Sequence, residues 1–325
     1  MKIRATFLLL TVALGVASVG PAIAAPPATE VQPEYVILFV LEGFGQESLK
    51  AGAMPVLSKL VKNGSVTWSA SAVNPPLRLP TMASLILGLP VEKHGIDWDT
   101  FEFARGYPRP PSMFDYLDLS GGKDTAVFFM DESLYQLARP ASFIDYQVCG
   151  PLRPECRAAT VVTYVRDYFK KGEKGGHSHY VYALPHLLMV HLADAGRAGQ
   201  EHGWTSKAYR EASQEVDRAI GSILDLYKEY KLLDHTTVIV TALSGTGTQK
   251  QNGSLPHVPW IASGANIKAG HTIAMPVSIM DTGATVMRAF GLETHTEWQS
   301  RAIEEIFRAP RAIVRNQPAL NLHGQ

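Results

Sequence analysis

Stretches of apolar residues alternate with amphipathic stretches along most of this chain. Residues 34–41, EYVILFVL, form a nearly continuous apolar run, which is typical of a strand covered on both faces of a sheet. Segments 124–130, 179–192 and 236–243 contain further runs of the same kind. The pattern therefore predicts four buried strands.

Helical spacing of apolar residues predicts the elements between these strands. Thr205 or Ser206 is placed to cap a long helix that returns to the sheet. The apolar face of this helix comprises Ala212, Val216, Ile220, Ile223 and Leu224. A second helix is expected between an N-cap at Asp281 and a stop at Gly291. Alternating strands and helices without an internal repeat predict an α/β fold, a doubly wound, mostly parallel sheet with helices on both faces.

The loops that follow the predicted strands should meet in space. In an open parallel sheet these loops gather along one edge, so segments 42–45, 193–203 and 244–247 should line a single cleft. Ligand sites of this fold class lie at that edge. The residues of these three segments are therefore the first candidates for function.

Composition limits the classes of protein that fit. The chain has 325 residues, of which 46% are hydrophobic and 18% charged, so it can build a large core. No break in composition divides residues 34–310, which we expect to form one domain followed by a tail at 311–325. The net charge is zero and no long basic run occurs, which gives no electrostatic reason to expect a nucleic-acid partner.

The N-terminus has the layout of a secretory signal peptide. Lys2 and Arg4 precede an apolar run that ends in small residues, which predicts a signal peptide over 1–25 and a linker over 26–33. An uncleaved membrane anchor is the alternative. No later stretch is long and apolar enough to span a bilayer, so we expect a periplasmic or secreted protein with no membrane span after cleavage.

Export affects the interpretation of the two cysteines. Cys149 and Cys156 flank a short loop with two prolines, and such a pair in an oxidising compartment is most simply a disulfide. Two free buried thiols remain the alternative, because spacing alone does not fix the geometry.

Several stretches together resemble the alkaline phosphatase superfamily, in particular its type I phosphodiesterase and nucleotide pyrophosphatase branch. They include VILFVLEGFG, LRLPTMASLILGLPVEKHGI, TVIVTALSGTG and SIMDTGATVMRAFG, and the similarity runs from about residue 35 to residue 308. The resemblance implies two divalent ions, commonly zinc, that Asp and His side chains hold at the sheet edge. These ions would activate a Thr or Ser nucleophile.

The residues that match the family's reactive positions have the wrong chemistry. Glu42 stands where the family has the first Asp, and its extra methylene suits that site poorly. RLPT matches the family's Thr-x-Pro-Asn run, which puts Arg78 at the nucleophile and Thr81 at the Asn. A guanidinium stays protonated and cannot act as a nucleophile.

The remaining ligand positions carry residues that do not bind zinc well. The family's Asp and His after the third strand, its Asp and His after the fourth strand and its final His correspond to Gly196, Gln200, Leu243, Ser244 and Asn252. Glu42 is then the one ligand left, and one weak ligand cannot hold two ions. His94 matches a family histidine that is structural. We therefore expect no catalytic residues and no metal.

Three functional hypotheses follow. The first is an exported, catalytically inactive protein that acts through an unknown protein partner or a small anionic ligand. The second is a metal-dependent phosphodiesterase or phosphatase with two zinc ions on relocated ligands, namely Glu42, Asp194, His202 and His257. The third is an enzyme of another kind, for which the sequence offers no Ser-His-Asp arrangement.

Arg78 has two possible roles within the first hypothesis. Its guanidinium can occupy the former metal space and pair with Glu42, which would otherwise be a buried unpaired carboxylate. Alternatively, it can form an anion-binding site together with the backbone N–H groups of a helix that starts near Pro80. The sequence leaves both roles open.

Overall fold

A computed structural model describes residues 32–51, 54–140, 144–148, 156–173, 184–246 and 255–309. The predicted signal peptide, most of the linker, the C-terminal tail, Cys149 and Asn252 lie outside the described residues.

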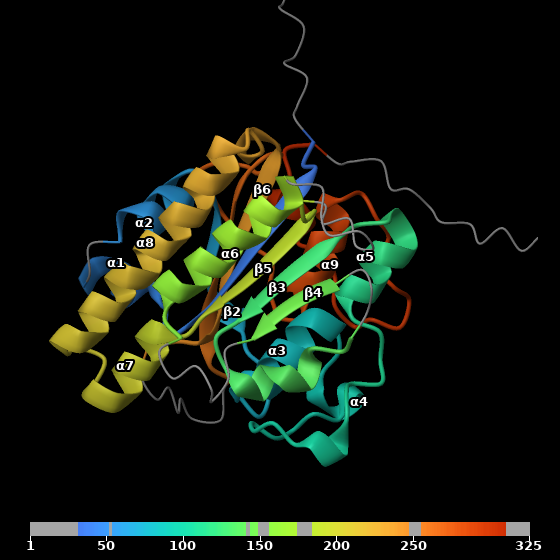
Figure 1. Cartoon of the computed structure of the whole chain (residues 1–325), viewed down its shortest axis with the longest axis horizontal. Coiled ribbons are helices and arrows are strands. Elements are labelled where there is room, and N and C mark those ends of the chain that lie inside the picture. Colours follow the sequence, from blue (N-terminus) through green and yellow to red (C-terminus); the bar gives the residue numbers. More distant parts are fainter. Residues whose placement is uncertain are drawn as a thin grey trace, which may run out of the picture.

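The described strands form one mixed sheet of eight strands in the order β4-β3-β5-β1-β6-β7-β2-β8 (Figure 1). Of these strands, β7 alone runs against the others, because it pairs antiparallel with both β6 and β2. The strands are β1 (Tyr35–Glu42), β2 (Gly64–Ser71), β3 (Thr125–Phe129), β4 (Ile144–Val148), β5 (Leu187–Leu192), β6 (Thr236–Ser244), β7 (His257–Gly264) and β8 (His271–Thr272).

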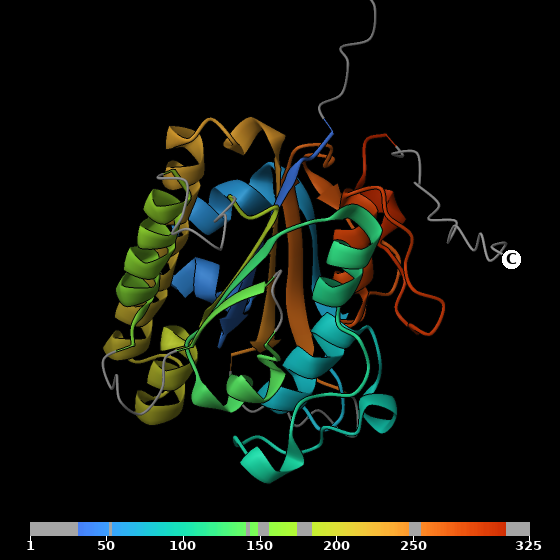
Figure 2. The same ribbon diagram turned by 45° about the vertical axis from the view of Figure 1, so that its right-hand side comes forward.

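Helices cover both faces of the sheet, as the alternating pattern predicts. One layer contains α1 (Gln46–Ala51), α2 (Pro55–Lys62), α6 (Ala158–Glu173), α7 (Asp194–His202) and α8 (Lys207–Glu229), and the other contains α3 (Arg78–Leu87), α5 (Met113–Gly121) and α9 (Asp281–Ala289) (Figures 1 and 2). The short elements are α4 (Val91–His94), η1 (Phe103–Arg105), η2 (Glu132–Leu137), η3 (Leu233–His235) and η4 (Glu304–Ile306).

The four predicted strands correspond to β1, β3, β5 and β6, which are neighbours at the centre of the sheet. Their side chains are almost fully buried, and β1 is buried at every position after Tyr35. This burial on both faces explains their continuous apolar sequences. The α/β fold with a mostly parallel sheet is thereby confirmed.

Several element boundaries differ from the prediction. The segment 193–203 contains helix α7 rather than a loop alone. Helix α3 begins at Arg78, not near Pro80. Asp281 is the first residue of α9 and not its N-cap, because its carboxylate accepts hydrogen bonds from the Ser278 and Arg301 backbone N–H groups outside the helix. For α8 the predicted cap is correct, since the Ser206 hydroxyl accepts the Tyr209 N–H at 3.1 Å.

Candidate functional site

The segments that follow β1, β5 and β6 meet at the carboxyl edge of the sheet. The Gly43 N–H donates to the Ser244 hydroxyl oxygen at 3.1 Å, and the Phe44 N–H donates to the Ser244 carbonyl at 3.2 Å. Gly43 has a φ of +65°, and a Cβ there would lie 2.7 Å from the Gly196 Cα. The three segments therefore lie at one edge, as predicted, and are in van der Waals contact.

Glu42 and Arg78 form a bidentate ion pair at this edge. Glu42 is the last residue of β1 and its side chain is 4% exposed, while Arg78 is the first residue of α3. The Arg78 Nε donates to Glu42 Oε1 at 2.5 Å, and Nη2 donates to Oε2 at 3.0 Å. Both carboxylate oxygens thus receive parallel charge-assisted hydrogen bonds, which are the strongest kind. The pairing proposed from the sequence is confirmed.

His191 is a third member of this cluster and was not among the residues predicted for the site. It lies in β5 beside Glu42, is fully buried, and its Nε2 is 2.9 Å from Glu42 Oε1. The Met130 backbone N–H points at its Nδ1 from 3.3 Å. Because an N–H can only donate, Nδ1 accepts and the ring proton lies on Nε2. The Nε2–H group of His191 therefore donates to Glu42 Oε1.

The cluster keeps Glu42 ionised. Burial alone would raise the pKa of Glu42, but hydrogen bonds from His191 and Arg78 outweigh burial and lower the pKa to about 2. Burial would likewise lower the pKa of Arg78, but the hydrogen bonds and charge of Glu42 raise it above its ordinary value. The pair is therefore fully charged at neutral pH.

Asp131 and Arg197 extend the cluster. The Arg78 Nη1 lies 3.2 Å from Asp131 Oδ2, and the Arg197 Nη2 lies 3.7 Å from the same oxygen. The Asp131 Oδ1 accepts from the Ser133 N–H and hydroxyl at the start of η2. All three nitrogens of the Arg78 guanidinium thus face carboxylates, so most of its charge is already balanced.

The N-terminus of α3 also has an acidic partner. The Leu79 N–H donates to Asp99 Oδ1 at 2.7 Å, and the next residue, Pro80, has no N–H. Burial raises the pKa of Asp99, although this hydrogen bond opposes the change. Because a carboxylate already occupies the helix start, few backbone donors are left there for an external anion.

The other positions that match the family's reactive residues have different environments. Leu243 is buried, and Thr81 is buried with a hydroxyl that has no hydrogen-bond partner among the described residues. Gln200 is exposed on α7. Gly196 leaves no room for a side chain, because a Cβ there would lie 2.6 Å from the Glu42 Cβ. An aspartate at 196 is therefore incompatible with the present position of Glu42.

His94 has the structural role expected from the sequence. It is buried at the end of α4, its Nδ1 accepts the Ile96 N–H at 3.1 Å, and its Nε2 is 2.8 Å from the Ser84 hydroxyl. Burial lowers the pKa of His94 to about 4, so the ring is neutral at pH 7.

The four relocated ligands of the second hypothesis have separate environments. Asp194 Oδ2 accepts the Ala158 N–H at the start of α6, at 3.0 Å. His202 is exposed at the other end of the nine-residue helix α7, about 12 Å along its axis from Asp194. His257 is exposed at the start of β7. Among the described residues, no three His, Cys, Asp or Glu side chains lie close enough to hold one ion.

The residues at this edge do not fit a two-zinc centre. Zinc needs several carboxylate, imidazole or thiolate donors that are free to coordinate. Here the Glu42 oxygens are bound by Arg78 and His191, and Gly196 and Leu243 have no donor side chain. The guanidinium also brings positive charge to the carboxylate that an ion would need.

The α/β fold and the sequence comparisons identify a protein of the alkaline phosphatase superfamily. The chain belongs to the type I phosphodiesterase / nucleotide pyrophosphatase family, whose sequence model matches residues 36–283. It is 26% identical over 241 residues to human ectonucleotide pyrophosphatase/phosphodiesterase family member 1, and 25% identical over 226 residues to the rat protein. These alignments cover 69% and 62% of this chain. The chain spans only about a quarter of the curated relatives it matches, 24% and 23% of their lengths.

Solved structures support the same fold. An inactive form of murine ectonucleotide pyrophosphatase/phosphodiesterase 5 in complex with AMP superimposes with a TM-score of 0.65 at 12% identity, covering 84% of this chain and all of that one. The 2-O GAG sulfatase BT1596 superimposes with a TM-score of 0.67 at 13% identity, covering 86% of this chain and 75% of that one.

The structure bears only in part on the predicted disulfide and on the predicted absence of a membrane span. Cys156 is buried just before α6, but Cys149 lies outside the described residues, so the disulfide stays a prediction. Within the described ranges, no helix has the length and apolar character needed to cross a bilayer.

Proposed function

We propose that this protein is an exported, catalytically inactive member of its family, formed by one domain over residues 34–310, that acts by binding a protein partner or a small anionic ligand. The observation that carries the proposal is the bidentate Arg78–Glu42 pair, at 2.5 and 3.0 Å, at the family's nucleophile and first metal-ligand positions. A protonated guanidinium has no lone pair with which to attack phosphorus.

Electrostatics support the loss of metal binding. An incoming zinc ion would have to displace Arg78 from Glu42 and then remain beside its charge. His191 already uses its one proton to bond Glu42, and its other nitrogen accepts the Met130 N–H. Metal binding here would therefore compete with the three hydrogen bonds that Glu42 accepts from Arg78 and His191.

Exposed apolar side chains beside the site support a binding role. The segment between α4 and α5 is joined to η2 by a hydrogen bond from the Glu102 N–H to Gln136 Oε1 at 2.9 Å, close to Asp131. Large apolar side chains are exposed in this region, namely Leu77 (38%), Phe101 (43%), Phe103 (88%), Tyr107 (42%) and Tyr135 (46%). Of these residues, Phe101 and Tyr135 contact each other, with ring centroids 5.9 Å apart, and a joint apolar surface of this kind can take part in recognition.

The decisive experiment measures metal content and hydrolysis on the same preparation. We expect mass spectrometry to find no stoichiometric transition metal and bis(p-nitrophenyl) phosphate to remain uncleaved with added zinc, while an active relative assayed in parallel cleaves it. About two zinc ions per chain, with turnover that a chelator abolishes, would contradict the proposal. Because Asp194 and His202 lie at opposite ends of α7, that result would require a ligand set other than Glu42, Asp194, His202 and His257 in their present positions.

Titration calorimetry separates the two roles of Arg78. AMP is a suitable anion because the murine structure contains it. If Arg78 is an ion-pair partner, the wild type and an Arg78→Lys variant should bind AMP and inorganic phosphate equally weakly. Binding by the wild type that Arg78→Lys weakens at least tenfold would instead establish the anion site.

Export is tested by N-terminal sequencing of the mature protein from a periplasmic or culture-medium fraction. Cleavage near Ala24 or Ala25 is the expected result. Recovery of the intact Met1 terminus in a membrane fraction would support the anchor instead.

A further inference from the structure

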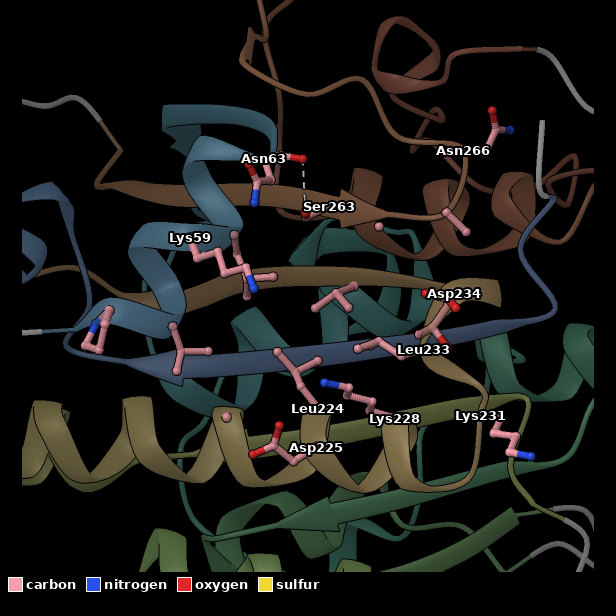
Figure 3. A pocket seen from close by; sticks show the side chains of 18 of the residues that line it. Lys59, Asn63, Leu224, Asp225, Lys228, Lys231, Leu233, Asp234, Ser263 and Asn266 are labelled. Carbon is pink, nitrogen blue, oxygen red and sulfur yellow. Dashed lines mark hydrogen bonds between the residues drawn. The ribbon is translucent and has the colours of Figure 1, made fainter. Parts of the chain in front are cut away.

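A large pocket opens at the other end of the sheet from Glu42 and Arg78. It has a volume of about 1020 Å³ and lies between α2, α8, the start of β6 and the end of β7 (Figure 3). Since β6 has nine residues, the pocket lies about 25 Å from the substituted site. Its volume is at the upper end of the range usual for small-molecule sites.

Apolar side chains from three elements form much of the pocket wall. Val56 and Leu60 come from α2, Leu224 from α8 and Leu233 from η3, and all four are only partly buried. Each therefore presents apolar surface that the protein itself does not cover. A ligand with an apolar body would bury this surface.

Two lysines extend over this surface from opposite walls. Lys59 on α2 and Lys228 on α8 point toward the middle of the pocket, whereas Lys231 points away from it (Figure 3). Within the described part of the chain, neither Lys59 nor Lys228 has an ion-pair partner within 4.0 Å. Lysines are common in the last turn of a helix, but that preference does not require two of them to converge.

The charge around the pocket is positive although the chain as a whole is neutral. Lys59, Lys228, Lys231 and Arg308 line it, against Asp225 and Asp234, so the lining carries a net charge of +2. The wall on the α2 side is held in place, because the Asp217 carboxylate on α8 accepts the Val56 and Leu57 N–H groups at 3.1 and 2.8 Å. The pocket is thus a preformed combination of apolar surface and cations.

We propose that this pocket binds a small single-chain amphiphile, with its anionic head group between Lys59 and Lys228 and its apolar chain along Leu60, Leu224 and Leu233. Cationic and neutral head groups do not fit, since only an anion gains from both lysines. The proposal does not depend on catalytic inactivity, because the pocket shares no residue with the substituted site. Hydrolysis of a phosphodiester at the site that contains Glu42 would overturn the proposed function and leave this inference intact.

Titration calorimetry with soluble ten-carbon probes tests the ligand class. Decyl phosphate and decanoate share the apolar chain and differ in the head group, so the stronger binder identifies phosphate or carboxylate as the preferred anion. We expect one of them to bind with 1:1 stoichiometry and about 100-fold more tightly than inorganic phosphate, because the chain buries apolar surface. Decyltrimethylammonium, which has the opposite charge, should not bind.

Charge variants locate the site. Lys59→Gln and Lys228→Gln should each weaken binding of the preferred probe about fivefold, as expected for a partly exposed charge pair. Lys62→Gln is the matched control, since Lys62 lies on α2 but does not line the pocket, and it should change affinity less than twofold. All three lysines are exposed, so these variants should fold.

The inference is overturned if the wild type binds neither anionic probe, if decyltrimethylammonium binds as tightly, or if Lys62→Gln weakens binding as much as Lys59→Gln. A Leu224→Gln variant supplies an independent readout. It should weaken binding of decyl phosphate and leave the weak binding of inorganic phosphate unchanged, and an equal loss for both would contradict the proposed position of the chain.

Discussion

Replacing Arg78 by leucine tests whether the guanidinium has taken over the role of a metal ion. The substitution keeps the aliphatic bulk of the side chain but removes every hydrogen bond to Glu42 that the guanidinium makes. The Glu42 side chain, which is 4% exposed, would then keep only its hydrogen bond with His191. A buried carboxylate without a cation is among the most destabilising features that a single substitution can create.

The pKa of Glu42 gives the expected magnitude. One pKa unit corresponds to about 1.4 kcal/mol, so lowering the pKa from 4.5 to about 2 corresponds to about 3 kcal/mol at neutral pH. Loss of one partner of a buried ion pair typically costs about 3–5 kcal/mol, which agrees. Because the folded-state pKa is lowered, this stabilisation is present above pH 4.5 and is lost as the pH falls through about 2.

Equilibrium urea unfolding at several pH values provides the assay. Arg78→Leu should lower the free energy of unfolding by about 3 kcal/mol at pH 7, and the difference from wild type should shrink as the pH falls from 4.5 toward 2. Arg166→Leu is the control, since its pair with Glu229 is 3.6 Å long and exposed, and it should cost less than about 1 kcal/mol. A loss below about 1 kcal/mol for Arg78→Leu, or one that does not vary with pH, would refute the reasoning.

Three further predictions use the same unfolding assay. Gly196→Ala should cost roughly 1–3 kcal/mol, because its Cβ would lie 2.6 Å from that of Glu42. Gly221→Ala within α8 should cost less than about 1 kcal/mol, because its Cβ would meet only the partly buried Val56 side chain, at 3.0 Å, and alanine favours the helix; equal effects would contradict the steric argument. His191→Leu should cost about 1–3 kcal/mol, since it leaves a backbone N–H unpaired, and a neutral effect would show that the bond to Glu42 contributes little. The lowered pKa of His94, about 4, means that its contribution is present above pH 6.5 and lost as the pH falls through 4, so His94→Gln should flatten that part of the wild-type profile.

The central strands were predictable because burial on both faces leaves a continuous apolar sequence. The strands that the sequence did not reveal lie outside this central group. In β2, GSVTWSAS, apolar and polar residues alternate and five of the eight positions are Ser, Thr or Gly. In β7, HVPWIASG, a proline interrupts the run, and the backbone pairs with β6 on one side and β2 on the other. The alternation in β2 is typical of a half-buried strand and could have been recognised from the sequence, whereas the proline in β7 argues against a strand.

The sequence predicts the site only at the positions that align with the family's reactive residues. Glu42 and Arg78 are 36 residues apart, and only the family motif brings them to one edge. His191 and Asp131 correspond to no reactive position considered in the sequence, so their contacts depend on strand register and on the start of η2. A histidine inside the apolar run LLMVHL is the one local indication that could have drawn attention to β5.

Charge couples Glu42 to Arg78, whereas the constraint at Gly196 is steric and would persist with aspartate at 42, because aspartate has the same Cβ. Restoring an aspartate at 196 alone would force its Cβ against Glu42, at 2.6 Å. Shortening Glu42 to aspartate alone would draw its oxygens away from Arg78 and leave that guanidinium with Asp131, 3.2 Å away, as its nearest remaining acid. Removing Arg78 alone would leave the carboxylate uncompensated. Each of these single substitutions is therefore expected to lower stability, and none of them alone supplies a complete set of metal ligands.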